Sequence, residues 1–238
     1  MPGGSDAAWL AQRAAESIQR RAWQGPDELL KGLAGDLIEA FAHEATRPLA
    51  DRWELPCGAM MLASAEADGL RLSWIGDCRA VLRAGDGRTM AFGATAASEA
   101  EEAALVAELA RTRGDPAQRY RDPAALAALR AGRALALQES AARVLAPDPG
   151  FLSHVRSEHV RANHAALLLM TDGFAASELR YGLHAGPEAL MAAAASHGLA
   201  PIAAGLRSFE ERTDPDGLLK PRWKRSDDAT ALMLEFRA

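Results

Sequence analysis

The sequence predicts an α+β fold, because its extended and helical segments come in separate blocks along the chain. Extended segments follow one another from residue 59 to residue 92, divided by Asp-Gly pairs at 68–69 and 86–87. Asp-Gly between short apolar runs is the strongest local signal of a hairpin, so this block is expected to form an antiparallel meander. Helical patterns precede and follow it. Such a block order disfavours parallel βαβ units and favours helices layered on antiparallel sheet.

Two amphipathic helices are expected first, at residues 7–23 and from Pro26 onward. Ser5 or Asp6 can cap the first helix, whose apolar residues recur at every fourth position. Pro26 suits the first position of the second helix, where its missing N–H loses nothing, and Asp27 and Glu28 favour the positive end of the helix dipole. The apolar stripe of this second helix comprises Leu29, Leu30, Leu33, Leu37, Ile38 and Phe41.

The remaining elements follow from composition and periodicity. Helices are expected at 98–113, 123–144, 187–196 and 200–212, and extended segments at 151–160, 165–171 and 229–236. His154 and His159 would then share one strand and point to opposite faces, which makes them poor joint ligands. Because no repeat or linker divides the chain, residues 1–238 are expected to form a single domain.

Charge and cysteine usage narrow the class of protein. The chain has 27 Lys plus Arg and 32 Asp plus Glu, a balance of -5 without a basic tract, so no nucleic-acid partner is expected. Cys57 and Cys78 have no metal-ligand spacing and are expected to be buried thiols of a reducing compartment. The chain has no leader pattern and no apolar run near about 18 residues, so a cytoplasmic protein without membrane contact is expected.

Carboxylates stand at the ends of three extended runs. The apolar run "LLLMTDGF" stops at Asp172 and Gly173, Asp77 lies in "WIGDCRAVL", and Asp227 and Asp228 precede "ATALML". An ionised carboxylate at the end of a buried strand requires a cation or hydrogen bonds to offset its desolvation. Carboxylate oxygens are the hard ligands that Mg²⁺ and Mn²⁺ prefer, whereas the His and Cys spacing of a zinc site is missing. The alternative interpretation is a surface turn at each aspartate.

The ordered segments "GDCRAVL", "LLLMTDGF" and "SDDATALML" resemble the signature of the metal-dependent type 2C Ser/Thr protein phosphatases of bacterial type. The resemblance spans about residues 1–238 and implies a four-layer αββα sandwich of two antiparallel sheets flanked by helices, here lacking the first strands. It implies that Asp172, with Gly173, and Asp227 bind metal, that Asp228 is their neighbour, and that Asp77 contributes to a weaker position.

The activity that this resemblance implies is dephosphorylation of phosphoserine and phosphothreonine in proteins by a water molecule that Mg²⁺ or Mn²⁺ activates. No catalytic side chain beyond the metal ligands is assigned. The expected partner is therefore a phosphorylated protein.

The beginning of the chain departs from the family pattern. The family carries a bridging aspartate in an Asp-Gly-x-Gly-Gly segment, of which residues 2–4 keep only the x-Gly-Gly part. A two-metal site without that ligand binds its ions weakly, so impaired activity is expected from a displaced start, a truncation or a degenerate homologue. A catalytically inactive phosphatase-like binding or regulatory module is the alternative function, and an unrelated α+β protein is the third interpretation. Missing first strands would also leave an unpaired sheet edge that favours self-association.

Overall fold

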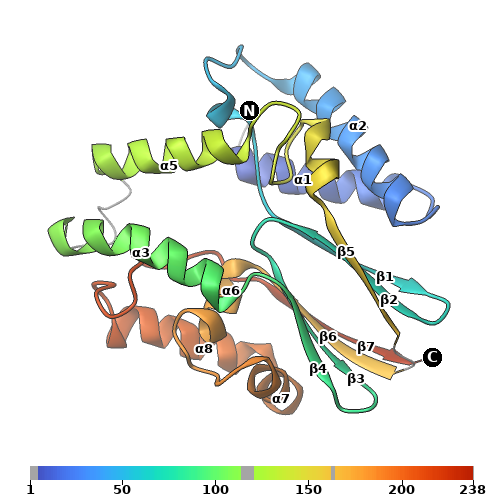
Figure 1. Ribbon diagram of the computed structural model, residues 1–238, viewed down its shortest axis with the longest axis vertical. Helices are drawn as coiled ribbons and strands as arrows, with labels where there is room; N and C mark the ends of the chain where they lie inside the picture. The colour runs from blue at the N-terminus through green and yellow to red at the C-terminus, as the bar shows by residue number, and fades with distance from the viewer. Residues whose placement is uncertain (1–4, 114–120, 162–163, 238) are drawn as a thin grey trace. The chain divides into compact units, whose positions relative to one another are not determined.

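The computed structural model describes residues 5–113, 121–161 and 164–237, drawn in Figure 1. The chain forms two compact units, each assembled from three stretches of sequence. The first unit contains Met1–Glu66, Leu70–Gly76 and Leu129–Val160, and the second contains Ala67–Gly69, Asp77–Ala128 and Arg161–Ala238. The fold is α+β with two antiparallel sheets flanked by helices, which confirms the predicted class. The single-domain expectation stays a prediction.

The first unit has a three-stranded sheet in the order β1-β2-β5, and α1 pairs with α2 beside it. Its elements are α1 (Asp6–Arg20), α2 (Pro26–Glu44), η1 (Arg52–Glu54), β1 (Met60–Glu66), β2 (Gly69–Ile75), η2 (Pro149–His154) and β5 (Arg156–Arg161). Of the two candidate caps, Ser5 caps α1, and Pro26 opens α2. Leu10, Leu33 and Leu37 of the two helices are buried with Phe151 in one apolar core.

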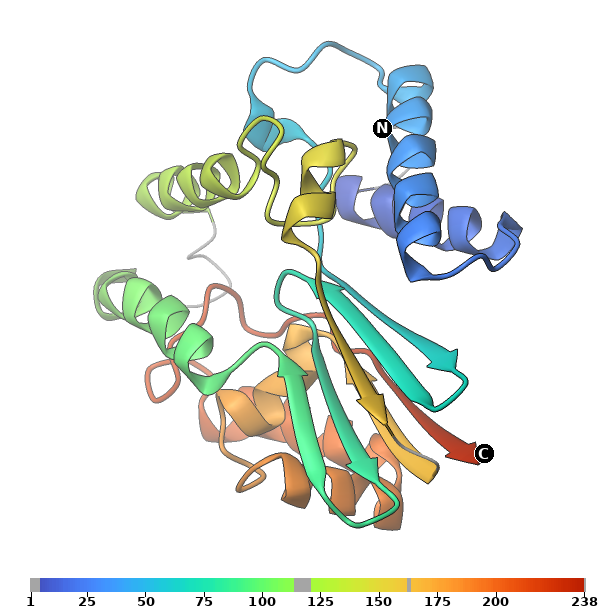
Figure 2. The same ribbon diagram turned by 45° about the vertical axis from the view of Figure 1, so that its right-hand side comes forward.

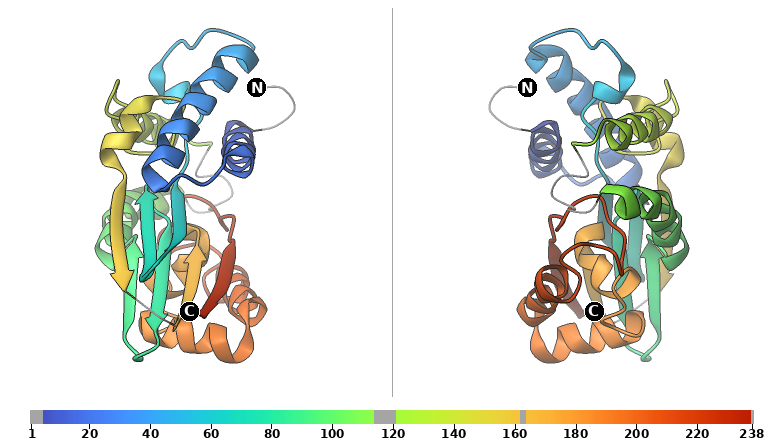
Figure 3. Two further views of the ribbon diagram at one scale, coloured as in Figure 1. Left: turned by 90° about the vertical axis from the view of Figure 1, so that its right-hand side faces the viewer. Right: turned by 90° about the vertical axis from the view of Figure 1, so that its left-hand side faces the viewer.

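The second unit has a four-stranded sheet in the order β4-β3-β6-β7. Its elements are β3 (Arg79–Ala84), β4 (Thr89–Gly93), α3 (Ala96–Arg113), β6 (His164–Met170), α6 (Asp172–Leu179), α7 (Pro187–His197), α8 (Leu199–Ser208), the π-helical turn η3 (Phe209–Thr213) and β7 (Ala231–Arg237). Leu168 pairs with Val81 on one side and Met233 on the other. These residues pack with Leu190 and Met191 of α7, which covers one face of the sheet (Figures 2 and 3).

Two predicted elements are wrong in extent. The helix expected at 123–144 is α5 (Pro123–Ala136), and the chain beyond it is irregular, because Ser140 adopts a positive φ of 56° and Leu145 forms a β-bridge with Gly58. Gly150 packs so closely on the Ser140 backbone that a side chain there would collide with it. The extended segment expected at 151–160 begins as the 3-10 turn η2, so only its second half is the strand β5.

The predicted meander and the end of strand β6 also differ from expectation. The four strands from Met60 to Gly93 form two hairpins that belong to different sheets, because the chain turns at Gly76, which has a φ of 82°. The Asp-Gly after β6 opens a helix, α6, that the sequence pattern did not predict.

Three further observations concern the chain as a whole. Neither Cys57 nor Cys78 is in a disulfide, and both are half-buried rather than fully buried. In the part of the chain that the structure describes, no single helix is long and apolar enough to cross a membrane; α7 and Leu199–Thr213 reach that hydropathy only together, across a bend of 118°. The expected self-association through a sheet edge stays a prediction.

Candidate carboxylate site of the second unit

The strand register brings three of the predicted aspartates to one edge of the four-stranded sheet. Met170, the last residue of β6, pairs with Arg79 of β3 and with Ala231 of β7. Asp77 lies two residues before Arg79, Asp172 two residues after Met170, and Asp227 four residues before Ala231. Because neighbouring antiparallel strands run in opposite directions, one strand's end and the starts of its two neighbours meet at the same edge. The three aspartates are therefore neighbours in space although 150 residues separate the first from the last.

Hydrogen bonds fix the junction between the start of α6 and the segment before β7. The Thr171 N–H donates to the Thr230 carbonyl at 3.0 Å, and the Thr230 N–H donates to Thr171 Oγ1 at 3.1 Å. Thr171 Oγ1 donates to the Asp228 carbonyl at 3.3 Å.

Gly173 allows the segment before β7 to lie close to the start of α6. A Cβ at this position would collide with the Asp228 carbonyl oxygen and lie 3.1 Å from the Cβ of Asp227. Asp228 thus takes part in the junction through its backbone, while its side chain is exposed.

The carboxylates of this cluster perturb one another. Burial raises the pKa of Asp172 to about 6, and the negative charges of Asp77 and Asp227 add to that rise. Asp77 is exposed as a residue, but desolvation of its carboxyl group, with Asp227 as a further contributor, also raises its pKa. The Cys78 thiol has its pKa raised to about 12 by burial and by Asp77 and Asp172, which keeps it protonated near neutral pH. The negative charges of the cluster therefore repel one another.

Two positive side chains next to the cluster, those of Arg180 and Lys224, are each paired with a carboxylate. Arg180 Nε donates to Glu99 Oε2 at 2.7 Å. Lys224 Nζ lies 2.6 Å from Asp227 Oδ1, which also accepts the Asp228 N–H at 2.8 Å. A cavity of about 20 Å³ beside these groups has room for one water molecule or one ion of similar size. Its lining includes Asp172, Gly173, Arg180, Tyr181, Lys224 and Asp227.

A buried ion pair that the sequence analysis missed holds the loop next to this cavity. Asp214 and Arg222 are 3% and 2% exposed, and Arg222 Nη1 donates to Asp214 Oδ2 at 2.7 Å. Asp214 also accepts the backbone N–H groups of Leu218, Leu219 and Lys220 at 2.9 to 3.0 Å. The only sequence signal was the turn composition of "TDPDG", which favours an Asp that bonds to its own loop.

The predicted metal residues are thus near one another, but they do not form a closed ligand cage. Within the described ranges, the carboxylate oxygens of Asp77, Asp172 and Asp227 are not all within 4.8 Å of one another.

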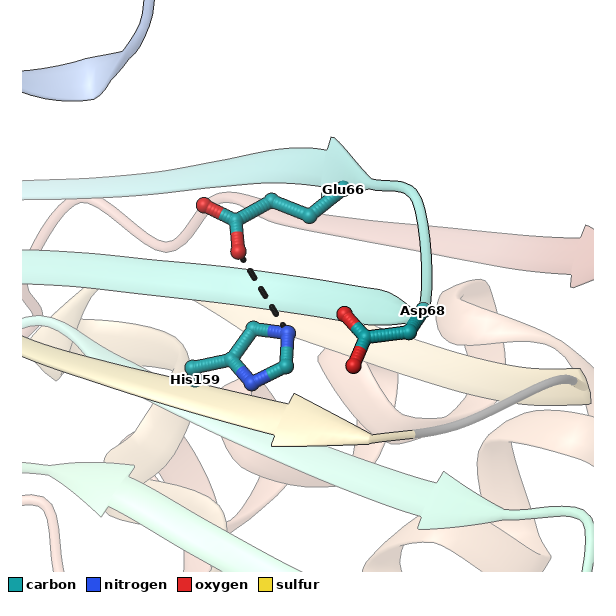
Figure 4. A group of neighbouring side chains, drawn as sticks. All are labelled: Glu66, Asp68 and His159. Carbon is teal, nitrogen blue, oxygen red and sulfur yellow. Dashed lines mark ion pairs between the residues drawn. The ribbon is translucent and has the colours of Figure 1, made fainter.

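His159 belongs to the first unit, where its Nε2 lies 3.3 Å from Glu66 Oε2 (Figure 4). Glu66 also pairs with Arg71. His154 lies in η2 rather than in the strand of His159, which corrects the assumption that the two share one strand.

Comparisons with known proteins find likenesses among solved structures. No family model matches this sequence, and no curated protein matches it. Among solved structures, the chain is similar to "PppA, a key regulatory component of T6SS in Pseudomonas aeruginosa", with a TM-score of 0.48 and 14% sequence identity over 98% of this chain and 81% of that chain. At that score and identity, inference about function depends on this chain's own residues.

Proposed function

We propose that this chain is a phosphatase-2C-like domain that binds Mg²⁺ or Mn²⁺ and acts on phosphoserine or phosphothreonine in a protein partner. The observation that carries the proposal is the meeting of Asp77, Asp172 and Asp227 at one sheet edge through the pairing of β6 with β3 and β7. The three segments that resemble the phosphatase signature are the ones that supply these aspartates.

The donor set fits a hard divalent cation. The pKa values of Asp77 and Asp172 are raised in part by the negative charge of Asp227, and a divalent ion relieves that repulsion. Asp172 and Asp227 would hold the ion, Asp77 would serve a weaker position, and Asp228 would support them through its backbone. When bound, such an ion lowers the pKa of its water and offsets the charge of a phosphate group.

This chain's own residues set the conditions for that chemistry. Gly173 lets the Asp227–Asp228 backbone approach α6, and the hydrogen bond between Thr171 and Thr230 fixes that position. The half-buried position of Asp172 strengthens its interaction with a cation, because fewer water dipoles screen the charge.

A regulatory or binding module is the second candidate function. It is favoured by the ion pair between Lys224 and Asp227, which already neutralises one of the three carboxylates. A domain of this kind would bind a phosphorylated partner with little turnover. Weak hydrolysis is the outcome we expect of such a module.

A calorimetric Mn²⁺ titration tests the cation site. Wild-type protein is expected to bind Mn²⁺, and Asp172→Asn is expected to weaken binding by about tenfold or more because it removes a charged ligand. Asp86→Asn is the matched control, since Asp86 is an exposed aspartate of the β3–β4 turn in the same unit. Equal heats from wild type and Asp172→Asn would refute the proposed site.

The same variants distinguish the two functions. Hydrolysis of a phosphoserine peptide that requires Mn²⁺ and disappears in Asp172→Asn supports the enzyme. Mn²⁺ binding without hydrolysis, together with retention of the phosphopeptide, supports the binding module.

A further inference from the structure

Lys224 supplies a positive charge to the carboxylate cluster from within the chain. Its Nζ lies 2.6 Å from Asp227 Oδ1, and its side chain lines the same cavity as Asp172. The side chains of Lys224 and Asp227 are 51% and 37% exposed, so water screens the pair and its strength is modest. An ammonium group at this place neutralises charge that a divalent ion would otherwise neutralise.

The segment that carries Lys224 is held at both ends. On one side, Arg222 is buried, pairs with Asp214, and donates from Nε to the Arg225 carbonyl at 2.9 Å. On the other side, Arg207 of α8 donates to the Asp227 carbonyl. Lys224 therefore starts from a fixed backbone position three residues before its partner. Fixing the backbone in this way reduces the conformational entropy that the ion pair must overcome.

We propose that Lys224 is the resident counter-ion of the carboxylate cluster, and that a divalent ion binds there only by displacing the ammonium from Asp227. The inference rests on the proposed cation site. It assigns to Lys224 the role of setting the metal concentration at which the site fills, because every ion that binds must first break this ion pair. Without metal, Lys224 stabilises the cluster; with metal, it competes.

The test is a Mn²⁺ titration by calorimetry of wild type and Lys224→Met, which keeps the length of the side chain but removes its charge. Lys224→Met is expected to lower the dissociation constant for Mn²⁺ by about twofold to fivefold, the range that a partly screened ion pair allows. It is also expected to lower the melting temperature in EDTA, because the carboxylates lose their counter-ion.

Two variants separate displacement from a general change in charge. Lys224→Arg keeps a cation at Asp227 and is expected to bind Mn²⁺ no more tightly than wild type. Lys220→Met removes one positive charge from the same loop but leaves the Lys224–Asp227 pair intact, and it is expected to change the dissociation constant less than twofold. An equal increase in Mn²⁺ affinity in Lys220→Met and Lys224→Met would refute the proposed displacement of Lys224.

The outcomes also separate this inference from the proposed function. If wild type binds Mn²⁺ and Lys224→Met binds it with equal or lower affinity, the role of Lys224 is refuted and the cation site stands. If neither protein binds Mn²⁺, the cation site itself is refuted, and so is the proposed competition between Lys224 and the ion.

Discussion

Asp172 is the residue whose environment most constrains the behaviour of the second unit. Its pKa rises from an ordinary value of 3.8 to about 6, first because it is buried and then because Asp77 and Asp227 lie near it. Between these two pH values the folded chain binds more protons than the unfolded chain. Stability conferred by this group is therefore complete below about pH 4 and is lost as the pH rises towards 6.

We predict that Asp172→Asn is more stable than wild type in EDTA near about pH 7. Asparagine removes the buried charge, and the gain is about 1 kcal/mol once the partial exposure of the site is allowed for, which raises the melting temperature by a few degrees. The gain should shrink as the pH falls towards about 4, where both proteins are neutral at this position. Circular dichroism melts at three pH values measure it, and a gain that does not depend on pH would contradict the charge argument.

At the residue scale, the sequence predicted those site residues that a local sequence pattern marks. Asp77, Asp172 and Asp227 could be identified because each stands at the end of an extended apolar run. Lys224, Asp214 and Arg222 could not, because a surface-like stretch of charges does not show which partner each charge meets after folding. The burial of the Asp214–Arg222 pair depends on the whole fold of the second unit.

At the scale of elements, the close junction between α6 and the start of β7 depends on one glycine. We predict that Gly173→Ala destabilises the protein by about 2 to 4 kcal/mol, because its Cβ collides with the Asp228 carbonyl and either α6 or the Asp227–Asp228 segment must shift. Mn²⁺ binding should weaken in parallel, since Asp172 and Asp227 move apart.

Gly205→Ala is the matched control for this prediction. Gly205 lies inside α8, and a Cβ there meets no atom within 4 Å, so alanine should be neutral or stabilise by up to about 1 kcal/mol. Urea unfolding measures both variants. Equal stability of Gly173→Ala and wild type would show that the junction is not close-packed.

Elements with strong local signals were predicted well, and those decided by distant contacts were not. The second helix carries Pro26 at its start and acidic residues in its first turn, the two hairpins carry Asp-Gly turns, and the structure has all three elements. Helix α6 was missed because Asp-Gly also signals a turn and its eight residues are too short for a clear period. The helix expected up to residue 144 was too long, since alanine content favours helix but the bridge of Leu145 to Gly58 lies outside the local pattern.

At the scale of the whole molecule, the path of the chain links the two compact units. The chain passes from one unit to the other after Glu66, Gly69, Gly76, Ala128 and Val160, so neither unit consists of a continuous stretch. If one unit unfolds, the segments that connect the pieces of the other unit become flexible loops. The folded unit must then overcome the entropy of closing those loops. The single-domain expectation therefore requires that the two units unfold together.

Tryptophan fluorescence can test this coupling. Trp9, Trp23, Trp53 and Trp74 lie in the first unit, and Trp223 is the remaining tryptophan of the chain. In Trp223→Phe, fluorescence therefore reports the first unit alone. Leu168→Ala, added to this background, should destabilise the second unit by about 2 to 5 kcal/mol, because Leu168 is fully buried between β3 and β7. We predict that the urea midpoint seen by fluorescence falls as far as the midpoint seen by circular dichroism.

Leu33→Ala supplies the reciprocal control, since Leu33 is fully buried in the core of the first unit. It should lower both midpoints to a similar extent, because a cooperative transition responds to a core defect wherever the defect lies. A fluorescence midpoint that stays in place in Leu168→Ala while circular dichroism shows an earlier transition would mean that the units unfold independently. The carboxylate site would then belong to a second unit that can lose its structure without the first.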